Sequence, residues 1–155
     1  MQNIKKEGKR AMSRQILKKE RIITDRLTLG SYRKEDRDRL AEMMRNPEIT
    51  ATFMVPDYSE EVQFYALADK LIEFSQINDT THLEYGVYLD GYMIGFVNDC
   101  GYDDEAIDLV YVFDPAFKGR GFATEAVNAV INELHEMGFK KVEAGLLKEI
   151  SATEK

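Results

Sequence analysis

The chain has 155 residues and a mass of 17.8 kDa, with 44% apolar and 10% aromatic residues, which suits one soluble globular domain and is too little for two. No apolar run approaches the ~20 residues that cross a bilayer, and the first residues, MQNIKKEGKR, lack the apolar centre of a secretory signal. These features exclude a membrane-spanning protein and predict a cytoplasmic one. The single cysteine, Cys100, excludes an internal disulfide, and we expect it to be a small buried hydrophobe and not a nucleophile.

Charge is distributed unevenly along the chain. The formal net charge is −7, but residues 1–21 carry +6, so the remainder carries −13. An acidic body favours cationic partners such as polyamines, aminoglycosides or basic protein tails, and disfavours DNA or RNA bound by the body itself. Ordinary surface charge for solubility explains the same composition.

Residues 1–20 are predicted to form a basic N-terminal extension, and residues 21–155 to form the domain. The extension is either a solvated arm, a contact to ribosomal RNA, or a segment that precedes a natural start near Met12. The RNA contact is less favoured than the other two taken together. A first strand is expected at Ile22–Ser31.

Two helices are expected next. Helical spacing predicts the first over Lys34–Arg45, ended by Asn46-Pro47, and the second from Ser59, its N-cap, to Ile77. Three methionines in this region are interpreted as core filling in preference to an acceptor pocket; they are Met43, Met44 and Met54.

Alternating apolar residues predict three strands after the helices. His82–Leu89 and Tyr92–Cys100 are joined by Asp90-Gly91, a hairpin turn of the primed type, and Ala106–Phe113 is the central strand. Their pairing is therefore expected to be antiparallel. A helix over Thr124–Met137, capped by Gly138, and a last strand at Lys140–Leu147 follow.

The segment between the central strand and the next helix, DPAFKGRGFATEA, predicts an anion site. Gly119 and Gly121 allow a tight turn that brings backbone N–H groups to a ligand, and the helix directs its positive dipole end at the same place. Lys118 and Arg120 add cations. The segment is neither a Walker A loop nor a Rossmann G-x-G-x-x-G loop.

This loop carries a resemblance to a known family. Lys118-Gly119-Arg120-Gly121-Phe122-Ala123 resembles the (Q/R)-x-x-G-x-(G/A) coenzyme A loop of the GNAT superfamily of N-acetyltransferases, with Lys at the first position. Ala123-Thr124-Glu125-Ala126 resembles the ribosomal-protein-alanine acetyltransferase-like branch. Thr24–Leu29 and Tyr92–Phe96 are similar to the family's first and third strands, so the resemblance covers roughly residues 21–147.

The resemblance implies an α+β fold, with a central, mostly antiparallel twisted sheet flanked by helices. It implies acetyl-CoA as co-substrate and direct transfer of its acetyl group to a primary amine, in a protein N-terminus or a small molecule. The arm of the coenzyme is expected along the central strand, at a bulge, on the backbone of Tyr111, Val112 and Phe113. The loop residues expected to bind the coenzyme are Lys118, Gly119, Arg120, Gly121, Phe122, Ala123 and Thr124.

Carboxylates near the expected cleft are candidates for the base that deprotonates the amine. They are Asp108, Glu84 and Glu105, and Asp108 is preferred because a carboxylate in an apolar strand is costly unless it is paired, solvated or used. A structural pairing role for Asp108 is left open, as is a role for Tyr111 as the acid that protonates the leaving thiolate.

Three further side chains are assigned no catalytic role. Glu125 is expected to be structural, because a carboxylate in the first turn of a helix meets the dipole favourably. His82 and His135 lack the spacing of metal ligands, so no metal site is expected.

The end of the chain leaves an alternative open. Family members continue past the last strand with a helix and closing strands, and often bind the coenzyme with an Asn; residues 148–155 match only a fragment of that helix and contain no Asn. Either the chain is truncated or the sequence is incomplete. A non-catalytic GNAT-fold module that binds acyl-CoA or another chain is therefore the alternative function, and a homodimer is not excluded.

Overall fold

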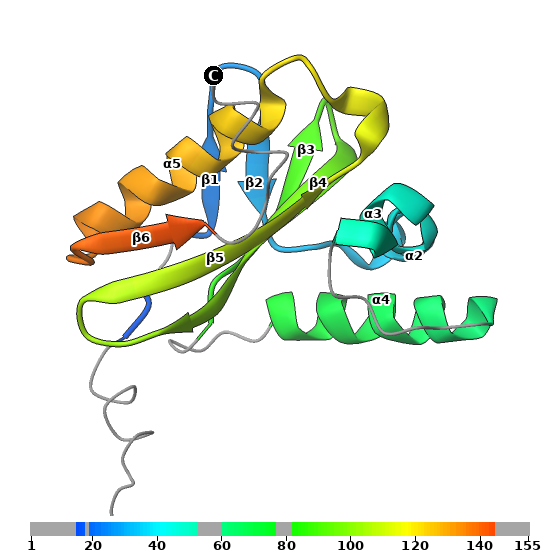
Figure 1. Cartoon of the computed structure of the whole chain (residues 1–155), viewed down its shortest axis with the longest axis horizontal. Helices are drawn as coiled ribbons and strands as arrows, with labels where there is room; N and C mark the ends of the chain where they lie inside the picture. Colours follow the sequence, from blue (N-terminus) through cyan, green and yellow to red (C-terminus); the bar gives the residue numbers. More distant parts are fainter. Residues whose placement is uncertain (1–14, 18, 53–59, 77–81, 145–155) are drawn as a thin grey trace, which may run out of the picture.

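The computed structural model describes residues 15–17, 19–52, 60–76 and 82–144, which form a six-stranded sheet with helices on both faces (Figure 1). The strands lie side by side in chain order: β1 (Arg21–Ile23), β2 (Thr28–Gly30), β3 (Glu84–Leu89), β4 (Tyr92–Tyr102), β5 (Ala106–Phe113) and β6 (Lys141–Ala144). All neighbours are antiparallel except β5 and β6, which are parallel. The predicted α+β class is confirmed.

The helices divide between the two faces. The elements are η1 (Lys34–Asp36), α2 (Arg37–Arg45), α3 (Pro47–Thr52), α4 (Glu61–Ser75), η2 (Pro115–Phe117) and α5 (Phe122–Glu136). Helix α5 lies on one face, and α2, α3 and α4 lie on the other (Figure 1). Because strand side chains alternate, β5 contributes to both resulting cores: Leu109 and Tyr111 pack on the α5 side, and Val112 packs on the α2 and α4 side.

Several elements agree with the sequence pattern. Strand β5 has the predicted bounds, and Asp90 (φ 52°) and Gly91 (φ 85°) form the predicted turn between β3 and β4. Met43 and Met44 are buried, as predicted for core residues, whereas Met54 lies outside the described residues. The predicted helix start at Ser59 also lies outside them, and the N-cap of α4 is Glu60.

Two expectations were wrong, and one short helix was not expected. The single strand Ile22–Ser31 is two strands, because the N–H of Thr24 donates to the carbonyl of Leu27 (2.9 Å) and turns the chain back on itself. Pro47 ends α2 but also begins α3, since the first turn of a helix tolerates proline. Cys100 is exposed, not buried, and lies where β4 carries one residue more than β5.

The last residues before β1 pack against the domain. Ile16 is 1% exposed in the core beneath α5, and the Lys19 carbonyl accepts a hydrogen bond from the Tyr85 hydroxyl (2.8 Å). Ile16 and Lys19, which the sequence places in the basic extension, thus contact the domain. Residues 1–14, where the predicted arm begins, lie outside the described residues. Within the described ranges, no helix is long and apolar enough to cross a membrane.

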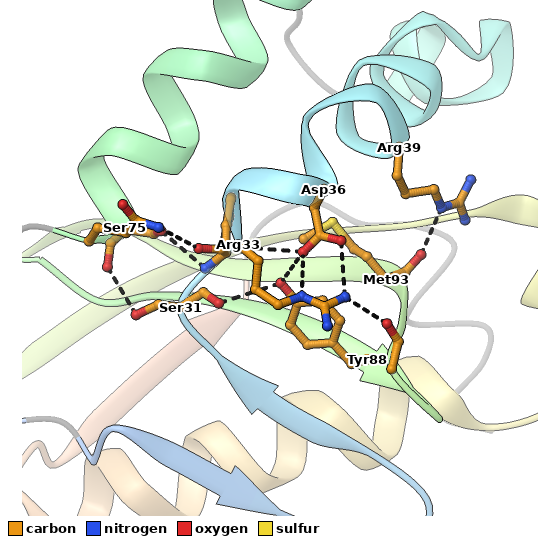
Figure 2. Close-up of polar contacts among 10 residues, drawn as sticks. Ser31, Arg33, Asp36, Arg39, Ser75, Tyr88 and Met93 are labelled. Atoms are coloured by element: carbon orange, nitrogen blue, oxygen red, sulfur yellow. Dashed lines mark hydrogen bonds and ion pairs between the residues drawn. The ribbon is translucent and has the colours of Figure 1, made fainter.

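A buried polar cluster fixes the helical layer to the sheet (Figure 2). Asp36 of η1 accepts hydrogen bonds from the guanidinium of Arg33 (both 3.0 Å) and from the hydroxyl of Tyr88 on β3 (2.8 Å). Burial, together with Asp36, raises the pKa of Tyr88, so this hydroxyl stays protonated and keeps donating. The cluster therefore sets the position of α2, which follows Asp36 directly.

Candidate functional site

The segment after β5 forms a glycine turn that leads into α5. Asp114 accepts a hydrogen bond from the Ala116 N–H (2.9 Å) and thereby caps η2, which the chain leaves at Lys118. Gly119 (φ 84°) and Gly121 (φ 80°) then adopt the left-handed conformation that other residues rarely take. Gly121 is the N-cap of α5 and has no side chain to close the end of the helix.

This geometry leaves a candidate anion site at the start of α5. The N–H groups of Phe122, Ala123 and Thr124 have no acceptor inside the helix, because the first bond of the ladder runs from Glu125 N–H to the Gly121 carbonyl (3.0 Å). The Thr124 hydroxyl is also buried and has no hydrogen-bond partner within the described part of the chain. Donors without acceptors at a helix N-terminus suit a phosphate group.

Two exposed cations border this turn, as the sequence predicted. Lys118 and Arg120 are both exposed. The guanidinium of Arg120 lies over the rings of Phe117 (5.4 Å) and Phe122 (5.2 Å), which contact each other edge to face. The aromatic pair holds the charge of Arg120 beside the turn while leaving it open to solvent.

A second arginine, Arg26, reaches the same turn from the β1–β2 edge of the sheet, and sequence reasoning missed it. Arg26, in the turn between β1 and β2, donates through Nε to Glu125 (2.7 Å) and through Nη1 to the carbonyl of Arg120 (3.0 Å). Glu125 also accepts from the Thr24 hydroxyl (2.6 Å) and the Arg26 N–H (2.9 Å). These contacts agree with the structural role expected for Glu125.

The environment of Glu125 keeps it ionised. Partial burial alone would raise its pKa, but the hydrogen bonds from Thr24 and Arg26 outweigh burial and lower the pKa below the ordinary value of 4.5. A negative charge therefore stands in the first turn of α5, next to the anion site, and the guanidinium of Arg26 compensates it.

Another ion pair joins the helical layer to the loop. Arg39 of α2 pairs with Asp114, and both side chains are nearly buried, at 11% and 14% exposed. Arg39 also donates through Nε to the carbonyl of Met93 on β4 (2.8 Å), a contact visible in Figure 2. The end of β5, from which the glycine turn starts, is thus fixed to α2.

The three predicted catalytic residues do not share one face of the sheet. Asp108 lies on the same face as Val112, toward α2 and α4. Glu84 lies on that face too, as does Tyr88 four residues further along β3. Tyr111 is 4% exposed and packs into the other core, beneath α5, edge to face with Phe113. The structure brings the two carboxylates to one side and places the phenol on the opposite side.

The two carboxylates differ in solvation. Asp108 is exposed, so solvent stabilises its charge and its place in an apolar strand needs no further explanation. Glu84 is half-buried, and it pairs with Asn98 across β3 and β4. The third carboxylate considered, Glu105, is exposed in the turn before β5, and its carbonyl accepts from the N–H groups of Lys140 and Lys141.

Asn98 and Tyr32 complete a buried polar row beside Glu84. The Tyr32 hydroxyl donates to the Asn98 side chain (2.7 Å), and both residues are buried, at 1% and 7% exposed. Burial, and then the nearby charge of Glu84, raises the pKa of Tyr32. Sequence reasoning missed this row because Tyr32 and Asn98 lie 66 residues apart.

Only the first half of β5 pairs with the described residues of β6. Residues 106–109 pair with residues 141–144, and the residues expected to hold the arm of the coenzyme, Tyr111–Phe113, lie past this pairing. The expected bulge in β5 is not observed on its side facing β4: the register between them is even from Leu109 to Phe113, and the shift lies at Cys100 of β4. Within the described ranges, no group of three or more His, Cys, Asp or Glu side chains could hold a metal ion.

A strand, a left-handed glycine turn and an open helix N-terminus, set in a sheet covered on both faces, define a protein that binds a phosphorylated ligand. The acetyltransferase (GNAT) domain family matches residues 26–152. The chain therefore belongs to the GNAT acetyltransferase family, in which acetyl-CoA is the co-substrate. A comparison with curated protein sequences gives no match.

Solved structures show the same fold. One is a GNAT-family acetyltransferase from Bacillus anthracis, with a TM-score of 0.67 and 17% identity over 86% of this chain and 78% of that one. Another is the microcin C7 self-immunity acetyltransferase MccE in complex with acetyl-CoA and AMP. Its TM-score is 0.66, with 16% identity over 84% of this chain and 76% of that one. A third is an acetyltransferase from Salmonella typhimurium that modifies the N-terminal serine of ribosomal protein L7/L12. Its TM-score is 0.57, with 14% identity over 74% of this chain and 67% of that one. At such identities the likeness shows the fold.

Proposed function

We propose that this protein is an N-acetyltransferase that moves the acetyl group of acetyl-CoA to a primary amine by direct attack on the thioester. The observation that carries the proposal is the left-handed turn at Gly119 and Gly121, with the open N-terminus of α5 behind it. The diphosphate of the coenzyme would accept from the first N–H groups of α5 and from the Thr124 hydroxyl, with Lys118 and Arg120 supplying charge.

The arm of the coenzyme would then follow β5. Its amides would bond to the backbone of Tyr111, Val112 and Phe113, in the manner of an added strand, beyond the residues that pair with β6. A backbone N–H there would polarise the thioester carbonyl in the transition state. The Tyr111 side chain faces the core beneath α5, so its backbone is a stronger candidate for a role than its phenol.

The amine needs a base to take its proton. Asp108 is the residue we propose, because it lies on β5 itself, is exposed, and shares the face of α2 and α4. Glu84 is the second candidate on this face. The acidic body of the protein, which carries −13 outside residues 1–21, would attract a cationic acceptor.

A thiol-release assay tests the proposal. Acetyl-CoA is offered with three classes of amine: peptides with a free N-terminal serine or alanine, polyamines, and aminoglycosides. Release of free thiol that depends on one class supports acetyl transfer. Coenzyme binding by calorimetry without release for any class supports the alternative, a non-catalytic acyl-CoA-binding module.

The two carboxylates are then separated by amide variants. Asp108→Asn is expected to lower kcat by about 10²-fold or more, since general-base catalysis contributes that much, and to leave the affinity for coenzyme A unchanged. Glu84→Gln is the matched variant on the same face. A larger loss of kcat in Glu84→Gln than in Asp108→Asn would transfer the role to Glu84.

A further inference from the structure

We propose that Arg26 is part of the coenzyme site, where it donates to the diphosphate and neutralises Glu125. The inference rests on the proposed function, because it assigns a residue of the β1–β2 turn to the ligand of the glycine turn. The position of Arg26 is 94 residues from the loop it contacts.

The guanidinium of Arg26 is held at the turn by two of its three nitrogen atoms and by one face of its plane. Nε is bound to Glu125, and Nη1 is bound to the carbonyl of Arg120, which lies between the two left-handed glycines. The plane of the group also lies over the ring of Phe122, at 4.3 Å. Two nitrogens and one face of the guanidinium are already in contact, so its orientation is fixed before a ligand binds. Binding would therefore cost little further side-chain entropy.

The third nitrogen, Nη2, lies beside the N-cap of α5. It would be 3.4 Å from a Cβ placed on Gly121, and it makes no hydrogen bond within the described part of the chain. A phosphate oxygen that accepts from the first N–H groups of α5 would come into reach of this nitrogen. An arginine donor and a helix N-terminus would thus converge on one anion.

Charge balance gives Arg26 a second effect. Glu125 is ionised and stands in the first turn of α5, where it would repel a diphosphate. Arg26 compensates that charge through direct contact, so its removal would both delete a donor and expose the ligand to Glu125. A residue that only stiffened the loop would have no such dependence on the charge of Glu125.

The test measures the affinity for coenzyme A, dephospho-coenzyme A and ADP by calorimetry. Arg26→Gln is expected to weaken each about tenfold, the loss of a charge-assisted hydrogen bond. The double variant Arg26→Gln with Glu125→Gln should regain part of that loss, because the unbalanced carboxylate is gone. In turnover, KM for acetyl-CoA should rise while kcat and the acceptor KM stay constant.

The chain offers a matched control. Arg37 of α2 pairs with Asp69 of α4 at 2.6 Å and is 47% exposed, against 2.7 Å and 44% for Arg26 with Glu125. Arg37→Gln removes an arginine of similar exposure from an ion pair away from the glycine turn, although its partner Asp69 is more exposed (53%) than Glu125 (18%), and should leave coenzyme affinity unchanged. Thermal unfolding of all variants confirms that each is folded.

The outcomes are distinct. Failure of the wild type to bind coenzyme A would refute the proposed function. Binding by the wild type with equal affinity in folded Arg26→Gln would refute the role of Arg26 alone. Two further results would also count against it: a loss that affects coenzyme A but not dephospho-coenzyme A or ADP, which would place Arg26 at the 3′-phosphate, and a double variant no better than Arg26→Gln.

Discussion

Two glycines with nearly the same positive φ angle allow the ligand-binding role of the loop to be separated from its backbone strain. Gly119 has φ 84° and Gly91, in the hairpin turn between β3 and β4, has φ 85°. A Cβ added to either would meet no atom within 4 Å. Gly119→Ala and Gly91→Ala therefore change the protein in the same way, except that only Gly119 lies in the proposed diphosphate turn.

The cost to stability should be similar in the two variants. A residue with a Cβ in the left-handed region costs roughly 1–2 kcal/mol, and the lower entropy of the unfolded chain returns about 0.4–1 kcal/mol. The net loss is about 1 kcal/mol in each case, small against the roughly 5–15 kcal/mol of a typical domain. Both variants should remain folded.

Affinity should separate them. The space around Gly119 that is free of protein atoms is where a diphosphate would approach the backbone, so a methyl group there should weaken coenzyme A binding by about tenfold or more, or 1.4 kcal/mol. Gly91→Ala should bind as the wild type does. Urea titration gives the two losses of stability and calorimetry the two affinities. Equal affinities for coenzyme A in the two variants would refute the placement of the ligand.

Three other predictions address the turn, the sheet and the pH dependence. Gly121→Val should abolish coenzyme A binding in a folded domain, because a β-branched residue resists φ 80° and its Cβ would be 3.4 Å from Arg26; unchanged calorimetric affinity would contradict it. Gly95→Ala should prevent normal folding, since its Cβ would lie 2.4 Å from the Val112 carbonyl oxygen; a soluble variant with wild-type urea stability would show that β4 and β5 can separate there. The stability difference between wild type and Glu125→Gln should be constant from about pH 5 to 8 and shrink as the pH falls below 4.5, because a carboxyl with a lowered folded-state pKa loses its contribution on protonation; a difference that grows in acid would reverse the sign.

Features set by neighbouring residues were predictable from the sequence. The alternation of Ala106–Phe113, the Asp90-Gly91 turn and the two glycines of the loop each specify a local conformation, and the structure has all three. Prediction from local composition failed where a short-range hydrogen bond turned the chain. Thr24 and Leu27 turn the backbone inside a segment whose composition is typical of one continuous strand.

Contacts between distant residues were not predictable. Arg26 and Glu125 are 99 residues apart, and each alone has an ordinary explanation, as a charged turn residue and as an acid in the first turn of a helix. The antiparallel β1–β2 hairpin, at the edge of the sheet, brings Arg26 to Glu125. The exposure of Cys100 is of the same kind, because it depends on a register shift between strands that no local pattern encodes.

The division of the sheet into two faces decides between the candidate catalytic groups more firmly than their chemistry does. A base must reach the amine, and in the proposed mechanism the amine binds on the face toward α2 and α4, which carries Asp108 and Glu84. The phenol of Tyr111 is enclosed by the core beneath α5, so it would have to cross the sheet to meet an acceptor on the other side. Under the proposed mechanism, an acid for the leaving thiolate would come from the face of α2 and α4 or from solvent. Tyr32 lies on that face, but its hydroxyl donates a hydrogen bond to the Asn98 side chain and its pKa is raised by burial, which makes it a poor acid for the thiolate.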